Sequence, residues 1–333
     1  MSPREGQVSA GMTEKVPTGI CLPLRGFGGA EALRLGQLAE ELGYDSVWVS
    51  ELASYDAIAV ATAIAATTEH IRIGTAIVPL TTRTPALHAM GASTFGDIAG
   101  ERAMVGYGLS TVPIIEGWHG QDLPKALPAV RDLFAIIDQA FTGESTDYEG
   151  TVLKSHGFRL EAPSKTPPQR YLGALGPKMR QFSREKCDGL ILNFAPRSAL
   201  GTIARRERPA GSKYGITLPI RTAVGNDLDG QIERFRREAA SYLRVPVYAE
   251  SLKEQGKAEV VEAVSGLGSL QEMADALPDD FVDDMGLLGN RDRVHETLAS
   301  IQDNGVTPLI VPIADPGDVA TYEQTIRATV PRG

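Results

Sequence analysis

The sequence predicts an α/β fold in which eight parallel strands and their helices form a (β/α)8 barrel, or TIM barrel, with insertion segments. Eight short apolar runs alternate with helix-length segments along most of the chain, an order that is typical of parallel α/β folds. The first run is not followed by the GxGxxG pattern of a dinucleotide-binding sheet, which disfavours an open doubly wound sheet. A length of 333 residues also suits a barrel that forms one domain.

Each predicted strand is a short run of apolar and small residues, because a barrel strand is buried on both faces. The clearest pair flanks an alanine-rich helical segment, and both of its members end in small residues. These two runs are Ile71–Pro79 and Arg102–Leu109. In chain order, the predicted strands are Thr18–Leu24, Asp45–Ser50, Ile71–Pro79, Arg102–Leu109, Arg170–Ala174, Asp188–Phe194, Tyr214–Val224 and Pro308–Pro312.

The predicted helices have apolar residues at helical spacing and recognisable end signals. Glu31–Leu42 has such an apolar stripe and is followed by Gly43, a residue type that commonly ends helices. Pro177 stands in the first turn of a later helix, where its missing N–H is tolerated. In chain order, helices are predicted at Glu31–Leu42, Asp56–Thr68, the alanine-rich segment after Pro79, Pro124–Phe141, Pro177–Lys186, the segment containing Arg205, the stretch ending near Leu243, and Arg291–Asn304.

The chain is predicted to be one barrel domain over residues 17–333, preceded by a flexible polar tail at 1–16. Two segments interrupt the alternation of strands and helices. Residues 143–158 read as a hairpin insertion, and residues 246–285 read as an irregular insertion that covers one face.

Composition narrows the class of protein. A formal net charge of −9 argues against binding to nucleic acid or to an anionic membrane surface. No apolar run approaches the ~20 residues that span a bilayer, and the N-terminus lacks a signal-peptide core. The two cysteines lie far apart in apolar contexts and are expected to be reduced. These features predict a cytoplasmic protein.

Several kinds of catalytic site have no matching pattern in the sequence. The five histidines show no metal-ligand spacing with each other or with the cysteines, so no metal site is expected. GxSxG and Walker-type motifs are also absent. A barrel without these groups usually takes its reactivity from an organic cofactor.

A cofactor would lie at the carboxyl ends of the barrel strands. Free N–H groups at the start of the helix after Ala174 suit a phosphate, with Gly176 allowing close approach and Lys178 adding charge. An ordinary strand–helix turn is the alternative interpretation. The backbone from Thr75 to Pro79 could pack against a planar ring, or it could be a buried strand with no ligand. Gly106 and Gly108 allow the same two readings.

Three residues are candidates for acid–base work. Glu51 ends the second strand and is the best acidic candidate, with a solvated or salt-bridged carboxylate as the alternative. Glu116 and His119 lie in or just after a short helix behind the fourth strand, together with Trp118. Packing roles are the alternative for His119 and Trp118.

Five blocks of sequence, in the same order, resemble the bacterial luciferase-like monooxygenase superfamily. Within it they look most like the branch that uses the deazaflavin coenzyme F420. The resemblance covers residues 18–312. The blocks are AEELGYDSVWVSE at 39–51, IRIGTAIVPLTTRTPALHAM at 71–90, VGYGLSTVPIIEGWHG at 105–120, YLGALGPKM at 171–179 and DGLILN at 188–193.

This resemblance implies an eight-stranded barrel with an insertion before the last strand, and a homodimer. It also implies that the cofactor ring lies on a bulge of the third strand, beside Thr75, with a non-prolyl cis peptide at Ala76–Ile77. The remaining cofactor contacts that it implies are Gly106 and Gly108 beside the ring, Leu175, Gly176, Pro177 and Lys178 at the phosphate, and Asn193 at the tail.

Two positions depart from the pattern of well-known deazaflavin enzymes. The second strand ends in Glu51-Leu52, where those enzymes carry an acid followed by a histidine. Leu109 stands where some relatives carry a glutamate. A proton would therefore come from Glu51, Glu116, His119 or the substrate itself.

Three functions remain open from the sequence. The first is an oxidoreductase that moves a hydride between C5 of F420 and a small organic substrate. The second is a two-component monooxygenase of the same fold, which uses FMN reduced by a separate enzyme. The third is a barrel that has lost catalysis and serves as a binding subunit. The identity of the substrate cannot be read from the sequence.

Overall fold

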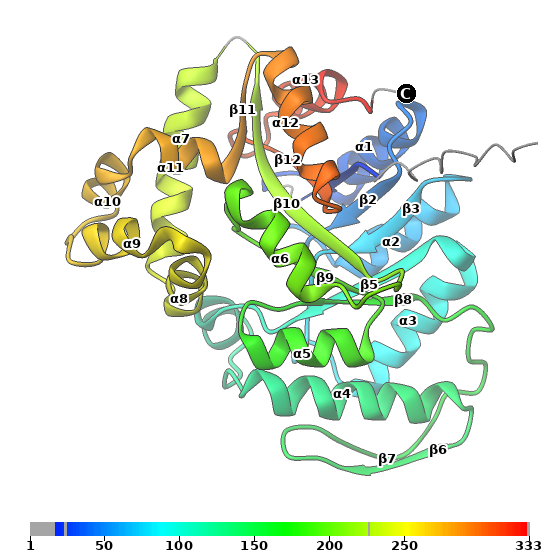
Figure 1. The fold of residues 1–333 in the computed structure, drawn as a ribbon. Coiled ribbons are helices and arrows are strands. Elements are labelled where there is room, and N and C mark those ends of the chain that lie inside the picture. Colours follow the sequence, from blue (N-terminus) through cyan, green and yellow to red (C-terminus); the bar gives the residue numbers. More distant parts are fainter. Residues whose placement is uncertain (1–16, 23–24, 226, 332–333) are drawn as a thin grey trace, which may run out of the picture.

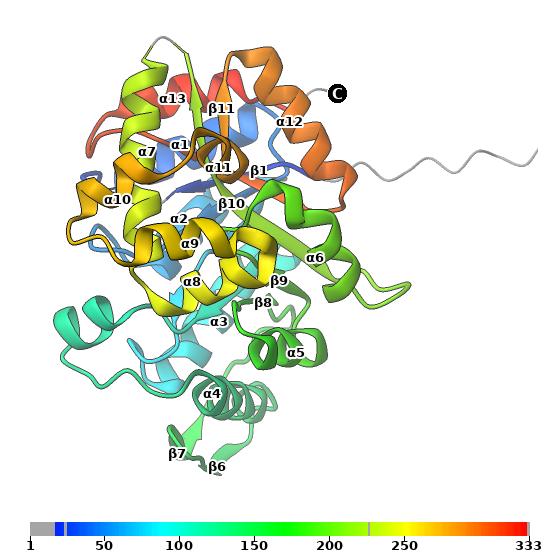
Figure 2. The same cartoon turned by 60° about the vertical axis from the view of Figure 1, so that its left-hand side comes forward.

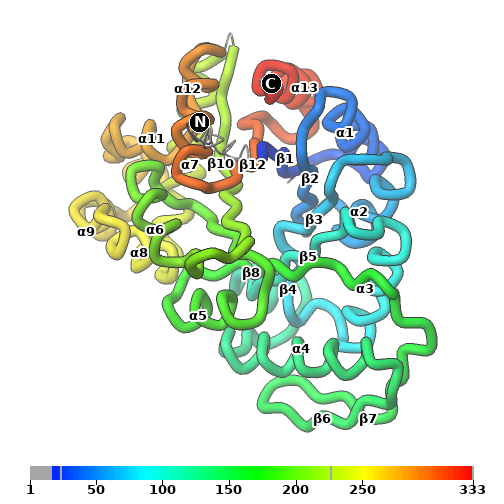
Figure 3. Tube along the Cα trace, turned by 45° about the vertical axis from the view of Figure 1, so that its right-hand side comes forward, coloured from blue at the N-terminus to red at the C-terminus, as the bar shows by residue number. Residues whose placement is uncertain are grey.

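Eight parallel strands close into a barrel in the computed structural model, which describes residues 17–22, 25–225 and 227–331. Each strand pairs with its neighbour around the ring, and the last pairs with the first. Figure 3 shows this ring with helices around its outside. The predicted barrel is therefore confirmed over an open sheet. Its strands are β1 (Gly19–Leu22), β2 (Ser46–Val49), β3 (Arg72–Thr75), β5 (Ala103–Gly108), β8 (Gln169–Gly173), β9 (Gly189–Ile191), β10 (Gly215–Val224) and β12 (Thr307–Pro312).

Four helices of the outer layer, α2, α3, α12 and α13, begin at side-chain caps that the sequence supplies. Asp56 and Asn290 each accept a hydrogen bond from a backbone N–H of the first helical turn, as N-cap residues do. The last helix, α13, was not predicted, and the predicted tail at 1–16 lies outside the described residues. The outer helices are α1 (Gly29–Glu41), α2 (Ala57–Ala66), α3 (Pro85–Ala99), α4 (Ala126–Phe141), α5 (Pro177–Lys186), α6 (Leu200–Glu207), α12 (Arg291–Asp303) and α13 (Val319–Ala328).

The third strand is not the single run that the sequence predicted. It stops at Thr75 and resumes as β4 (Val78–Pro79). Gly74 pairs with Met104 of β5, whereas Val78 pairs with Tyr107. Four steps along β3–β4 thus match three steps along β5, so one extra residue is inserted and the chain bulges.

Both insertions form regular structure. The first is the antiparallel hairpin of β6 (Ser145–Glu149) and β7 (Lys154–Arg159), which packs on the outside of α4 (Figure 1). The prediction that residues 246–285 are irregular is wrong. Four helices of seven or eight residues lie there, each too short to show a clear periodicity in the sequence. These helices are α8 (Pro246–Leu252), α9 (Ala258–Ser265), α10 (Leu270–Ala276) and α11 (Asp279–Met285), with the π-helical turn η4 (Lys253–Lys257) after α8.

The second insertion packs on α7 (Leu228–Leu243) at one side of β10, as Figures 1 and 2 show. An unpredicted strand, β11 (Gly286–Gly289), pairs with the end of β10 beyond the point where β9 stops. Its four residues, two of them glycine, are too few to stand out as a strand. We call α7–α11 with β11 the cap.

The barrel interior is filled by large side chains that face glycines on neighbouring strands. Trp48 and Tyr171 meet edge to face, with ring centroids 5.1 Å apart. A Cβ added to Gly74 would lie 2.4 Å from the ring of Trp48, and one added to Gly189 would lie 2.2 Å from that of Tyr171. These glycines make room for the aromatic rings. The filled interior, a packed core rather than a pore, forms a floor under the carboxyl ends of the strands.

Two expectations from composition can be compared with the described residues. Cys21 and Cys187 are both free thiols. In the described ranges, no helix combines the length and the apolar character that crossing a membrane requires.

His88 is a buried polar residue in α3. Its Nε2 lies 3.2 Å from the carbonyl oxygen of Leu80, and its Nδ1 has no hydrogen-bond partner among the described residues. Burial, and then the charge of Arg83, lower the pKa of His88 to about 4. The folded protein therefore holds this ring neutral.

We expect this burial to make stability depend on pH. In the unfolded state the histidine has a pKa near 6.5, whereas in the folded state the pKa of His88 is about 4. Between these two pH values only the unfolded state binds the proton, so protonation stabilises the unfolded state as the pH falls. Between pH 7 and pH 5, the free energy of unfolding should fall by about 2 kcal/mol more in the wild type than in His88→Gln. Urea unfolding at both pH values measures this, and equal pH dependence would contradict it.

Candidate functional site

The bulge between β3 and β4 is held from the β2 side by hydrogen bonds. The Ala76–Ile77 peptide bond is cis, as the resemblance implied. The Ser50 hydroxyl donates to the carbonyl oxygen of Ala76 over 2.7 Å, and the Sγ of Cys21 lies 3.4 Å from the same hydroxyl. The backbone N–H of Glu51 donates to the carbonyl oxygen of Ile77 over 3.4 Å. The main chain of the bulge is thus fixed in place.

Thr75 and Gly106 brace the bulge from the other side. The buried hydroxyl of Thr75 donates to the carbonyl oxygen of Gly106 (3.1 Å) and accepts from its N–H (3.0 Å). A Cβ on Gly106 would lie 2.2 Å from the carbonyl oxygen of Thr75. Both residues are buried, so their contacts support the bulge from beneath.

The surface of the bulge is formed by Ala76 and Ile77, which are partly exposed. The side chain of Ile77 covers the glycine ends of two neighbouring strands. Added Cβ atoms on Gly108 and Gly173 would lie 2.9 Å and 3.3 Å from it. Gly108 thus lets Ile77 lie flat over the end of β5, and the result is a smooth apolar ledge at the barrel mouth.

The start of α5 is open to a ligand. Gly176 is its N-cap, has an extended backbone and no side-chain cap, and Pro177 follows it. A Cβ on Gly176 would meet no atom within 4 Å, so there is free space over the first N–H groups of the helix. Leu175 is half-buried, whereas Lys178 is exposed. This arrangement fits a phosphate group.

A buried ion-pair cluster that the sequence did not indicate supports this loop from below. Arg180 donates a hydrogen bond to the carbonyl oxygen of Leu175. It also forms ion pairs with Glu207 and with Glu254 of η4, and the N–O distance is 3.0 Å in both pairs. Glu207 is only 1% exposed and also pairs with Arg184 and Arg206. No sequence pattern indicates the pairs of Arg180 and Arg184 with Glu207 or of Arg180 with Glu254, because α5, α6 and η4 are separate elements.

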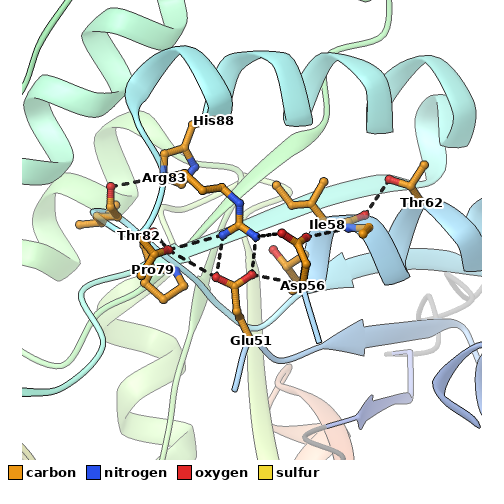
Figure 4. Close-up of polar contacts among 12 residues, drawn as sticks. Glu51, Asp56, Ile58, Thr62, Pro79, Thr82, Arg83 and His88 are labelled. Carbon is orange, nitrogen blue, oxygen red and sulfur yellow. Dashed lines mark hydrogen bonds and ion pairs between the residues drawn. The ribbon is translucent and has the colours of Figure 1, made fainter. Parts of the chain in front are cut away.

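Glu51 is held by an arginine rather than free at the mouth (Figure 4). Both of its carboxylate oxygens accept from Arg83 over 2.6 Å, and one accepts from the N–H of Ala57 over 3.1 Å. Arg83 also pairs with Asp56 over 2.5 Å. The oxygens of Glu51 face N–H donors, which suits an ionised carboxylate and leaves it no hydrogen to give. The geometry therefore favours the salt-bridged alternative, in which Glu51 anchors its loop.

The other two acid–base candidates lie on a separate element. Glu116 belongs to the π-helical turn η2 (Pro113–Trp118), and His119 follows it. Both side chains are exposed, and Glu116 accepts a hydrogen bond of 3.4 Å from the N–H of Leu123. No described contact joins either of them to the bulge or to the α5 loop.

Asn193 lies opposite the bulge strand, after β9, where the cap meets the barrel. Its Nδ2 donates to the hydroxyl of Tyr248 of α8 over 2.8 Å. Next to it, Phe194 stacks on Tyr242 of α7, with ring centroids 4.6 Å apart. The candidate cofactor residues thus form two walls, one from β3–β5 and one from β8–β9 with the cap. In the described ranges, no cluster of His, Cys, Asp or Glu could hold a metal ion.

We expect Arg83→Met to lower the free energy of unfolding by about 2–3 kcal/mol, because it leaves the half-buried carboxylate of Glu51 without its main partner. The Arg83 and Glu51 side chains are each 13% exposed. Arg34→Met, which removes a pair that is 48% and 28% exposed, is the matched control and should cost less than about 1 kcal/mol. Urea unfolding measures the free energy of unfolding of both variants. Equal losses of stability in the two variants would argue against an anchoring role for the Arg83–Glu51 pair.

Two curated proteins match most of this chain in sequence. A Mycobacterium tuberculosis protein named for coenzyme F420-dependent oxidoreduction is 28% identical over 310 residues, covering 82% of this chain and 88% of the relative. The 5,10-methylenetetrahydromethanopterin reductase of Archaeoglobus fulgidus is 26% identical, covering 82% and 86%.

Solved structures share the fold. The F420-dependent tetrahydromethanopterin reductase of Methanopyrus kandleri superposes with a TM-score of 0.73 at 21% identity, covering 95% of this chain and 97% of that one. The FMN complex of a Pseudomonas putida diketocamphane monooxygenase gives 0.65 at 19% identity, covering 95% and 97%. The model of the luciferase-like monooxygenase family matches residues 9–308, so this chain belongs to that family.

Proposed function

We propose that this protein is a coenzyme F420-dependent oxidoreductase that transfers a hydride between C5 of the deazaflavin and a small organic substrate. Its family and relatives support an oxidoreductase that uses F420 or a flavin. The observation that carries the proposal is the pairing of an apolar ledge at Ala76–Ile77 with an open helix start at Gly176. These two features suit the flat ring and the phosphate of one cofactor.

In this proposal, the ring lies against Ala76 and Ile77 above Gly108. The loop from Leu175 to Lys178 holds the phosphate, and Asn193 contacts the tail. Thr75 and Gly106 brace the bulge. The bound cofactor supplies a carbon that gives or accepts a hydride, which side chains alone cannot do.

The remaining residues orient and enclose the reactants. Glu51 anchors its loop against Arg83, so it positions the mouth instead of donating a proton. Where the reaction needs a proton, the substrate, Glu116 and His119 remain the sources that the sequence suggested. Both side chains are exposed in the structure, so they could act only on a substrate that reaches η2.

FMN is the second candidate cofactor, because it also joins a flat ring to a phosphate. A monooxygenase of this fold binds FMN. In that case a separate reductase would supply reduced flavin, and the product would carry oxygen. A barrel without catalysis is the weakest of the three functions, since no side chain fills the space above Gly176.

Titration with each cofactor tests the proposal. Absorbance and fluorescence of the cofactor measure its binding. We expect F420 to bind more tightly than FMN. Gly176→Val should weaken binding by at least about tenfold, because its side chain occupies the space of the phosphate. Gly266→Val, also next to open space, is the control and should bind like the wild type.

Each outcome of the titration has one meaning. Tighter binding of FMN than of F420 would favour the monooxygenase. If neither cofactor binds to the folded protein, the proposed function is wrong. If Gly176→Val binds as well as the wild type, the phosphate lies elsewhere.

We also infer a homodimer that forms through α3. Its outer face carries Leu87, Met90 and Ile98, which are 51%, 46% and 44% exposed. Their spacing places them on one side of the helix. The exposed residues of neighbouring α2 include Ala59, Ala63 and Ala66. This apolar face of small and large residues would pack well against a second copy. The cytoplasmic location stays a prediction.

Light scattering after gel filtration tests the dimer. With a chain mass of 35.6 kDa, the wild type should have a mass of about 71 kDa, twice that value. Met90→Glu should give the monomer, because a charge would be buried in the interface. Val247→Glu changes another exposed apolar residue, 49% exposed on α8, and should stay dimeric. A monomeric wild type would refute the inference.

A further inference from the structure

Arg221 projects from β10 into the barrel mouth. Side chains alternate along a strand, and Gly215 faces the interior, because its added Cβ would lie 2.5 Å from the hydroxyl of Tyr171. Arg221 lies an even number of residues after Gly215 on the same strand, so its side chain also faces the interior. It is paired in register with Val311, which belongs to the interior cluster with Cys21 and Trp48. β9 ends before this level, so the cap lies beside Arg221.

Two residues of α7 hold the guanidinium of Arg221. Its Nε and Nη2 donate to one oxygen of Glu238 over 2.8 Å and 2.5 Å, and Nη2 also donates to the hydroxyl of Tyr242 over 2.7 Å. Nη1 has no hydrogen-bond partner among the described residues. The side chain remains 13% exposed, and Nη1 is not among the fully buried polar atoms that lack a partner, so a small molecule in the mouth can reach this nitrogen.

Two tyrosines add further donors beside Arg221. The hydroxyl of Tyr242 accepts from Arg221, and that of Tyr248 accepts from Asn193. Neither hydroxyl hydrogen has an acceptor among the described contacts. Burial raises the pKa of Tyr248 to about 12, so its phenol keeps its hydrogen at neutral pH. Stacking on Phe194 and an edge contact of 4.8 Å between the two tyrosines fix the rings.

This group of donors lacks an acceptor, which indicates a ligand that supplies an oxygen. The charge of Arg221 is already matched by Glu238. A second carboxylate placed here would gain from Arg221 but would also be repelled by Glu238 at similar range. A neutral oxygen gains the hydrogen bonds without that repulsion. The cluster therefore favours a carbonyl oxygen over an anion.

We propose that Arg221 and Tyr242, with Tyr248 beside them, bind a carbonyl oxygen of the substrate at the barrel mouth. This inference rests on the proposed function and narrows its substrate class to carbonyl compounds. Arg221 and Tyr242 are then specificity-determining residues, supplied by β10 and by the cap.

Binding of two matched probes to the F420-loaded protein tests this inference. Cyclohexanone carries the neutral oxygen, and cyclohexanecarboxylate presents an anion on a similar ring. Saturation-transfer NMR gives both affinities without requiring turnover. We expect cyclohexanone to bind more tightly than the carboxylate.

Two variants and one control locate the binding site. Tyr242→Phe keeps the stacked ring and removes one donor, which should weaken cyclohexanone binding about three- to tenfold. Arg221→Lys keeps a positive charge beside Glu238 but removes the Nη1 donor that is proposed to bind the carbonyl oxygen. It should weaken cyclohexanone binding at least as much. Tyr148→Phe is the control. It removes a hydroxyl of the hairpin that donates to Asp132 of α4 over 3.1 Å, and this variant should bind cyclohexanone like the wild type.

The outcomes separate this inference from the proposed function. Failure of F420 to bind the wild type rejects the proposed function. If F420 binds to the wild type and both variants but cyclohexanone affinity is unchanged by Tyr242→Phe and Arg221→Lys, the inference is wrong. Tighter binding of the carboxylate, or no binding of cyclohexanone, would also overturn it.

Discussion

One extra residue between β3 and β4, relative to the paired strand β5, sets the geometry of the whole mouth. The register offset interrupts the ladder and turns a short length of main chain toward the ends of the neighbouring strands. It holds because polar groups on both sides are satisfied: Ser50 bonds Ala76, and Thr75 exchanges two hydrogen bonds with Gly106. Ile77 can then lie over Gly108 and form the ledge on which the proposed ring site depends.

Three arginines fix the loops around this ledge, and each of them links two different elements. Arg83 ties the loop after β2 to the start of α3 through Glu51. Arg180 ties the α5 loop to the cap through Glu254, and Arg221 ties β10 to α7 through Glu238. Fixed charges of this kind keep polar groups in place without a large conformational cost when a ligand arrives. The mouth thus combines an apolar ledge with a rigid charged frame.

The sequence was sufficient for the architecture, because apolar runs and helix end signals are local properties. The ends of α5, for example, match their prediction at both residues. The bulge position came from resemblance to a family, since a register offset depends on the partner strand. Helices α8–α11 of the cap were missed because each spans only about two turns. The sequence allowed a salt bridge at Glu51 but did not identify its partner, because Arg83 is 32 positions away. Arg180 and Arg221 carried no signal either, because their partners Glu254 and Glu238 belong to other elements, 74 and 17 positions away.

The cap has its own apolar core, built mainly from α7–α11 and joined to the barrel through few residues, among them Phe194, Ala223 and Ile313. Mutations within that core would therefore leave the floor and the bulge undisturbed. A lineage could remodel these helices while it retains the barrel beneath, provided that Glu254 and Glu238 keep their pairs with Arg180 and Arg221. Diversification of substrates would then proceed by changes in one module.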